Sequence, residues 1–147
     1  MRSLLVALPL LVLLVAAPAL GQSPTDELFE RLNKVRAANS LAPLARDARL
    51  DTAAAAHSAD MATLSQLFHV AETSGSPLDR ARAAGVESSD IAENVSMHDS
   101  ALEAQASLEA SPAHLTNMLG ATFTHVGLGV VATANGTYIT ELFARIE

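Results

Sequence analysis

The chain has 147 residues, a formal net charge of −7 and no cysteine. The excess of acidic residues excludes the positive surface of a protein that binds nucleic acid or an anionic membrane. The absence of cysteine excludes disulfide bonds and lipid attachment through a cysteine, so the core must be stable without cross-links. The chain is long enough for one ordinary domain.

Residues 1–21 predict a cleaved secretory signal peptide. Arg2 supplies the positive charge, residues 4–15 form an uncharged apolar core, and small residues lead up to Gly21. We therefore expect cleavage after Gly21.

The alternative to a cleaved leader is an uncleaved anchor helix. Pro9 and Pro18 interrupt the apolar run, and a spanning helix usually needs about 20 apolar residues. We therefore expect a single secreted or periplasmic domain over residues 22–147 without a stable membrane anchor. Its net charge changes from −7 to −8 because Arg2 is lost. The alanine-rich composition without cysteine is typical of a bacterial protein.

Two helices are predicted at the start of the domain. The first begins at Ser23 and Pro24, an N-cap and a first-turn proline. The second begins at the capping residue Asp47 and carries the clearest apolar stripe of the sequence: Leu50, Ala54, His57, Met61, Leu64 and Phe68. A lone histidine on such a face is more often a packed core residue than a ligand, so His57 is interpreted as core and not as part of a cleft.

Three shorter helices and one strand follow. A helix over residues 77–84 begins after Ser76 and stops at Gly85. Residues 91–95 alternate as a strand does. A capping box of Ser100 and Glu103 opens the fourth helix, and a break at Ser111 starts a fifth over residues 112–119.

The end of the chain predicts a β-hairpin. Asn135 and Gly136 form the favoured two-residue type I′ turn between two apolar, β-branched segments. Both arms are apolar on both faces, so the sheet needs helices on both sides. A hairpin alone is marginally stable, and residues 91–95 are expected to pair with it as a third strand. The fold class is α/β: a small antiparallel sheet between helices in an α/β/α sandwich.

Three residues outside the apolar stripes are candidates for chemistry. His69 follows the second helix, Glu93 interrupts an apolar strand, and His114 lies in the first turn of the fifth helix. A carboxylate within an apolar strand is costly unless it is paired or coordinates an ion. The helix N-terminus favours a neutral imidazole, which is the form that binds metals. Their positions alone leave two interpretations open: three unrelated polar residues, or a cluster of two histidines and one carboxylate.

The order of short motifs along the domain carries a resemblance to a known family. No single motif is specific, but their order and spacing together are. The motifs are Asn33 and Arg36; His57-Ser58-Ala59-Asp60-Met61; Phe68-His69; Pro77-Leu78-Asp79-Arg80; Ala84-Gly85; Ala92-Glu93-Asn94; Ser111-Pro112-Ala113-His114; Asn117-Met118-Leu119; Phe123; and Val126-Gly127-Leu128-Gly129. In this order they resemble the CAP superfamily (cysteine-rich secretory proteins, antigen 5 and pathogenesis-related proteins), in particular its cysteine-free bacterial branch.

The resemblance implies a three-layer α/β/α sandwich with a central cleft. The cleft residues would be His69, Glu93 and His114, with the two histidines as ligands of a divalent cation such as zinc. The ligand or partner implied is a small, lipid-like or sterol-like molecule, or an extracellular protein. Three departures from the family pattern are Ala92 and Ala113 in place of glycine and Leu108 in place of an aromatic residue.

The sequence leaves several functions open. The interpretation that we favour is a binding or interaction module. The alternative is a metal-assisted extracellular hydrolase, with Glu93 as general base and Ser111 as a nucleophile, although Ser111 is better explained as a helix cap. A third is a secreted fold whose polar cleft has no activity. In the CAP family a second glutamate stands just before the second histidine motif. Here that position holds Ser111, and the nearby Glu109 is out of register. The absence of this second acid favours binding, because acid–base catalysis needs two titratable partners.

Overall fold

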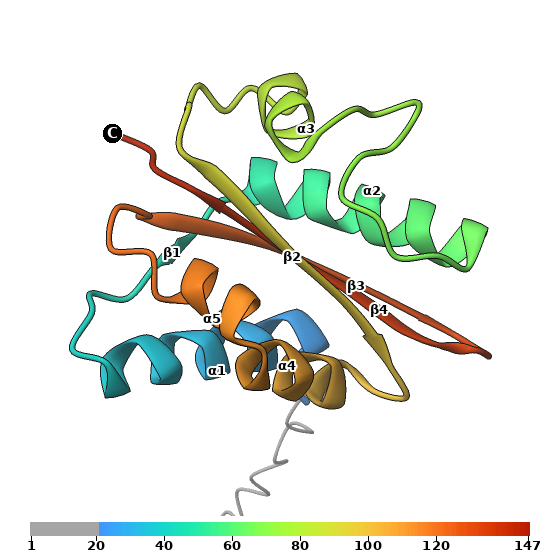
Figure 1. Cartoon of the computed structure of the whole chain (residues 1–147), viewed down its shortest axis with the longest axis horizontal. Coiled ribbons are helices and arrows are strands. Elements are labelled where there is room, and N and C mark those ends of the chain that lie inside the picture. Colours follow the sequence, from blue (N-terminus) through green and yellow to red (C-terminus); the bar gives the residue numbers. More distant parts are fainter. Residues whose placement is uncertain (1–20) are drawn as a thin grey trace, which may run out of the picture.

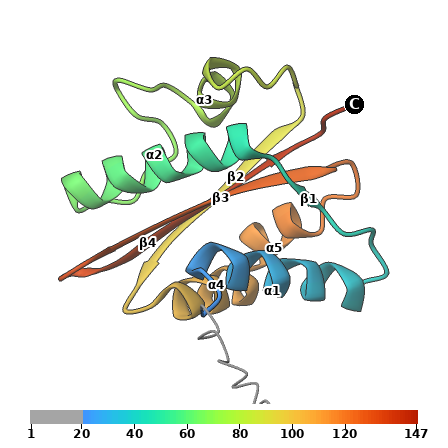
Figure 2. The same ribbon diagram turned by 180° about the vertical axis from the view of Figure 1, so that it is seen from behind.

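The computed structural model describes residues 21–147, which form three layers (Figures 1 and 2). Two helices, α2 and α3, cover one face of the sheet, and α1, α4 and α5 cover the other. The elements are α1 (Pro24–Ala38), β1 (Ala45–Arg46), α2 (Ala48–Leu64), α3 (Pro77–Ala83), β2 (Ile91–His98), α4 (Ala101–Ala110), α5 (Pro112–Met118), β3 (His125–Thr133) and β4 (Gly136–Ala144). The predicted sandwich is confirmed.

The predicted leader lies outside the described residues, apart from Gly21. Between residues 21 and 147, none of the helices combines the length and the apolar character needed to cross a membrane.

The sheet has the strand order β1-β3-β4-β2. β3 and β4 form the predicted antiparallel hairpin, and β2 runs antiparallel to β4 along its whole length. The predicted third strand is therefore confirmed and is longer than residues 91–95. Sequence patterns missed β1, a two-residue strand parallel to β3, because a segment so short has no periodicity. β2 is an outer strand, so its free edge lies at the boundary between the two helical layers.

The predicted helix starts have the expected capping hydrogen bonds. The side chain of Ser23 accepts one from the backbone of Asp26, and the carboxylate of Asp47 accepts two at the start of α2. Ser76 and Asp79 form a reciprocal capping box at α3. The starts of α1, α2 and α3 therefore follow from short-range chemistry that is visible in the sequence.

The predicted stripe of α2 is wrong at its C-terminal end. The helix ends at Leu64, and Ser65 adopts a left-handed conformation with φ of 52°. Leu64 is consequently 61% exposed. Phe68 lies beyond the helix and packs beside Met61, Val95 and Tyr138 in a small separate core.

The hairpin turn is one residue earlier than predicted. β3 ends at Thr133 and β4 begins at Gly136, so Ala134 and Asn135 form the two-residue loop. A type I′ turn requires positive φ at both loop residues, and of the residues from Thr133 to Gly136 only Gly136 has positive φ, 140°. The type I′ prediction is therefore wrong. The side chain of Thr133 closes the turn by donating to the carbonyl of Gly136 at 2.9 Å.

Two larger hydrophobic cores lie on the two sides of the sheet. The core beneath α1, α4 and α5 includes Leu28, Leu108 and Phe143, and the core beneath α2 and α3 includes Leu50 and Leu142. α2 lies so close to β3 that the strand has glycine at the contacts. A Cβ atom at Gly127 would lie 2.1 Å from the backbone of Leu50.

Replacing Gly129 by alanine should test this close approach. A Cβ atom there would lie 2.2 Å from the carbonyl oxygen of Ala54. Backbone cannot move aside as a flexible side chain does, so Gly129→Ala should destabilise the fold by about 3 kcal/mol in urea unfolding. Ala132→Ser, at an exposed position on the same strand, is the control and should change stability by less than about 0.5 kcal/mol. An equally small effect of Gly129→Ala would contradict the close packing.

Candidate functional site

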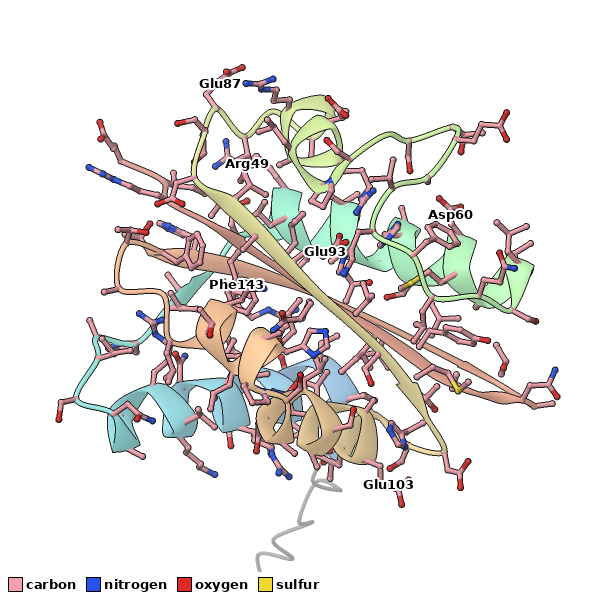
Figure 3. All side chains as sticks on the ribbon, in the orientation of Figure 1. Arg49, Asp60, Glu87, Glu93, Glu103 and Phe143 are labelled. Carbon is pink, nitrogen blue, oxygen red and sulfur yellow. The ribbon has the colours of Figure 1, made fainter. Side chains whose placement is uncertain are left out.

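Glu93 lies at the centre of the candidate site, on β2. One carboxylate oxygen, Oε2, accepts a short hydrogen bond from the guanidinium of Arg80. The other, Oε1, lies 3.0 Å from Nδ1 of His69 and 3.6 Å from Nε2 of His57. The side chain is only 1% exposed, and Figure 3 labels it between β2 and α2. The costly carboxylate is therefore paired with a cation and removed from solvent.

Arg80 connects this carboxylate to the loop before α3. Its guanidinium also donates to the carbonyl of Gly75 at 2.8 Å and to the carbonyl of His69 at 3.1 Å. The capping box that starts α3 places Arg80 at the first turn of the helix, where it is 5% exposed. Arg80 thus holds both the acid and the loop that carries His69.

His57 is fully buried, which confirms the expected burial. The expectation that it lies apart from the cleft is wrong, because it contacts Glu93. Its Nε2 lies 2.8 Å from the carbonyl of Phe68 and therefore carries the proton that is donated. Its ring packs edge-on against the ring of Phe68 at 5.2 Å. Burial lowers the pKa of His57, so the ring is neutral and forms part of the floor of the site.

His69 is the most accessible member of the site. It lies in the loop after α2 and not directly after the helix as predicted, because α2 ends at Leu64. Its side chain is 50% exposed. Since Nδ1 is directed at Glu93, the nitrogen left for a ligand is Nε2. A buried carboxylate that fixes the tautomer and orientation of an imidazole in this way is characteristic of histidines that bind ligands or metals.

His114 belongs to the opposite helical layer and is attached to β2 through its backbone. It lies on α5, and the amide of Asn94 donates to its carbonyl at 3.1 Å, which attaches α5 to β2. Burial, and secondarily the neighbouring imidazole of His69, lower the pKa of His114. Its ring is therefore neutral at neutral pH. Its Nδ1 is buried without a hydrogen-bond partner among the described residues.

The structure brings two of the three predicted residues into contact. His69 and Glu93 are hydrogen-bonded, whereas His114 makes no hydrogen bond to either through its side chain. Among residues 21–147, no group of three or more histidine, aspartate or glutamate side chains is arranged to hold a metal ion. Because Arg80 and His69 occupy its two oxygens, Glu93 does not fit the role of a third metal ligand. The donor set that remains is the two imidazoles.

Glu109 and Ser111, which lie close to His114 in the sequence, are not part of this group. Glu109 forms a two-point ion pair with Arg31 of α1, at 2.6 and 2.9 Å. Ser111 is the N-cap residue of α5, as interpreted from the sequence, although its side chain makes no capping hydrogen bond. The missed members of the site are Arg80 and His57. The available signal for Arg80 was Glu93 itself, since a buried carboxylate requires a cationic partner.

A second buried carboxyl group lies on the other face of the sheet. Glu141 of β4 is fully buried, and its Oε2 accepts a hydrogen bond from Asn94 at 2.8 Å. Burial raises the pKa of Glu141 to about 7, and the negative charge of Glu109 adds to this effect. Gln105 lies nearby and favours the ionised form, but its amide makes no hydrogen bond of good geometry. No sequence pattern distinguished this glutamate.

Comparisons with known proteins agree with this architecture. The profile of the cysteine-rich secretory protein family, CAP, matches residues 29–144. The uncharacterised protein YkwD of Bacillus subtilis is 30% identical over 129 residues, 87% of this chain and 49% of YkwD. The chain thus spans about half the length of this curated relative.

Two solved structures have a similar fold. An extracellular protein with an SCP domain from Bacillus anthracis is 27% identical with a TM-score of 0.76, over 82% of this chain and 40% of that one. The structure of NaASP2 with Zn²⁺ is 15% identical with a TM-score of 0.57, over 87% of this chain and 83% of NaASP2. The second likeness shows the fold alone.

Removing the cation of the buried pair should destabilise the domain. Arg80→Met leaves Glu93 buried without a charge partner, which should cost about 4 kcal/mol in urea unfolding. The double variant Arg80→Met with Glu93→Leu should recover most of that loss, because neither charge remains buried. Arg82→Met, an exposed position on the same helix, is the control. A neutral effect of Arg80→Met alone would show that the pair is not needed.

Glu141 should make stability depend on pH. Its pKa is about 7 in the folded protein against an ordinary value of 4.5, so the folded state holds the proton more tightly. Stability should therefore fall as the pH rises from 4.5 to about 7 and change no further above that range. Glu141→Gln should remove this loss, which corresponds to about 3 kcal/mol. Urea unfolding of the wild type and of Glu141→Gln, below pH 4.5 and above pH 7, measures this difference. The same dependence of stability on pH in both proteins would contradict the prediction.

Proposed function

We propose a ligand-binding rather than hydrolytic function for this chain, which belongs to the cysteine-rich secretory protein (CAP) family. The imidazoles of His69 and His114 would receive the ligand from opposite sides of β2. The observation that carries the proposal is the ion pair of Glu93 with Arg80, buried beneath a half-exposed histidine. Burying two charges costs several kcal/mol per ion, and here the pair orients one imidazole toward solvent. A buried carboxylate that orients an imidazole in this way is characteristic of histidines that bind a ligand.

A divalent cation, with zinc favoured, would be held in this cleft by His69 and His114. Both rings have a nitrogen that Glu93 does not occupy, and the lowered pKa of His114 keeps that ring in the form that ligates. Zinc sites in proteins usually have three or four protein ligands, so an oxygen of the bound molecule would complete the coordination. When bound, the cation would supply a Lewis acid for that oxygen.

Glu93 supports the choice of binding over hydrolysis. A general base must come within hydrogen-bond reach of the water or substrate from which it takes a proton. The carboxylate of Glu93 is 1% exposed and directed at Arg80 and His69. The ligand that we propose is a small or lipid-like molecule with an oxygen-containing head group.

We further propose that the protein acts outside the cytoplasm, as a secreted or periplasmic protein. The leader predicted in residues 1–21 supports this location. The relative from Bacillus anthracis is described as extracellular. Mass spectrometry of protein recovered from the culture medium or periplasm should show a terminus at or near Gln22, and recovery of an intact Met1 terminus would contradict cleavage.

Titration of Zn²⁺ into the purified protein by calorimetry tests the cleft. His69→Ala and His114→Ala should each weaken binding about tenfold or more, because each removes one imidazole ligand. Glu93→Gln should weaken it less than His114→Ala, since the amide oxygen can still accept the hydrogen bond from His69. Affinity should also fall as the pH drops through the imidazole range, because a protonated ring cannot ligate.

The matched control is His98→Ala. His98 is an exposed histidine at the end of β2, the strand that carries Glu93, and its replacement should leave the affinity for Zn²⁺ unchanged. Equal affinity of the wild type and both cleft variants would reject the two-imidazole site. In that case the family assignment and the fold would still stand.

A further inference from the structure

A second surface feature lies at the C-terminal end of α2, beside the cleft. The outer side of the helix and the loop that follows enclose an open groove of about 530 Å³, lined among others by Asp60, Thr63, Leu64, Phe68, Val70 and Glu72. Asp60 projects from α2 on the side away from the sheet (Figure 3). None of the groove's lining residues belongs to the pair of histidines proposed above.

The end of α2 and its loop expose an unusual amount of apolar surface. Leu64 is 61% exposed, Leu67 49% and Val70 67%, all within seven residues of sequence. Single exposed apolar residues are ordinary, but clustered ones mark interaction surfaces. None of these three residues belongs to the hydrophobic cores of the described residues.

The charged side chains that line the groove are all negative. Two carboxylates, of Asp60 and Glu72, line it, and no arginine, lysine or histidine does. α2 also ends here without a basic residue in its last turn, so the negative end of the helix dipole is not compensated by a side chain. The nearest arginine in the site, Arg80, is engaged by Glu93. A cation placed in this groove would therefore meet only negative charge.

We propose that this groove docks a basic amphipathic segment of a partner protein. Apolar side chains of the segment would cover Leu64, Phe68 and Val70, and a lysine or arginine would lie beside Asp60 and Glu72. Charge complementarity selects this occupant. An anionic lipid surface would be repelled by the two carboxylates, and a second copy of this chain would bring the same carboxylates against its own.

The groove and the site around Glu93 are adjacent but chemically independent. Phe68 lines the groove, while its backbone carbonyl accepts a hydrogen bond from the buried His57, which lies beside Glu93. The docking proposal uses no atom of His69 or His114. Variants of those two histidines therefore separate the two proposals experimentally.

Fluorescence anisotropy with a labelled probe peptide tests the proposal on the purified protein. The probe is an amphipathic peptide of leucine and lysine with the leucines along one helical face, and its counterpart has glutamate in place of lysine. The lysine peptide should bind and the glutamate peptide should not. Val70→Ser, and separately the pair Asp60→Asn with Glu72→Gln, should each weaken binding of the lysine peptide about tenfold. Val70 and Glu72 are exposed and Asp60 is half-buried, and none of them belongs to a hydrophobic core, so the variants should fold.

Two controls separate the groove from general charge and apolarity. Glu27→Gln with Glu30→Gln makes the same change of charge on α1, in the opposite layer, and Leu102→Ser removes an exposed leucine of α4. Both should bind the peptide like the wild type, as should His69→Ala. Equal weakening by the two neutralised pairs, or no effect of Val70→Ser, would overturn the proposal. Binding of phosphatidylglycerol vesicles, or self-association that Val70→Ser abolishes, would also overturn it by assigning the groove to a membrane or to a second copy.

Discussion

The side chain of Glu93 is almost completely removed from water, and α2, α3 and the loop between them supply the groups that surround its carboxylate. Arg80 supplies the positive charge from α3, His69 approaches from the loop after α2, and His57 lies beside it from α2 itself. The same guanidinium holds two carbonyls of the loop between α2 and α3. Arg80 thus helps attach this loop to the sheet, together with Phe68, which packs in the small core and is hydrogen-bonded by His57. The conformation of His69 depends on that attachment.

The alternation of side chains along β2 lets one strand serve both helical layers. Successive residues of a strand point to opposite faces, so Glu93 contacts α2 and α3 while Asn94 contacts α5 and β4. Because β2 is the outer strand, residues of both layers reach its free edge. This geometry explains how His69 and His114, far apart in sequence, come to flank one strand. Arg36 of α1 fixes the far end of α5 by donating to the carbonyls of Met118 and Gly120.

The elements that the sequence predicts are those determined by local chemistry. Helix starts depend on a few neighbouring residues, so Ser23, Asp47 and Ser76 were identified correctly. The end of α2 and the hairpin turn were misplaced because they depend on backbone conformation, the left-handed Ser65 and the positive φ of Gly136. A two-residue strand such as β1 exists only through its pairing with β3. Periodicity contains no information about that partner.

The site shows the same division between local and tertiary information. The expectation that Glu93 needs a partner follows from its apolar neighbours, and the structure supplies that partner. Which cation it pairs with is a property of the tertiary fold, because Arg80 lies on a separate helix. The same reasoning explains why Glu93 was assigned as a possible metal ligand. Pairing and coordination are alternative ways to satisfy a buried carboxylate, and sequence alone does not choose between them.

The sheet contains two buried carboxyl groups, and the comparison between them shows what Arg80 contributes. Glu93 meets a guanidinium and an imidazole, whereas Glu141 meets the amide of Asn94 and no cation. An amide dipole compensates desolvation much less than a full charge does, so burial raises the pKa of Glu141 to about 7. Asn94 hydrogen-bonds to Glu141 and also to the carbonyl of His114. Asn94 thus connects the carboxyl group of Glu141 to α5, the helix that carries His114. On the other face of β2, Arg80 stabilises the carboxylate of Glu93, which orients His69.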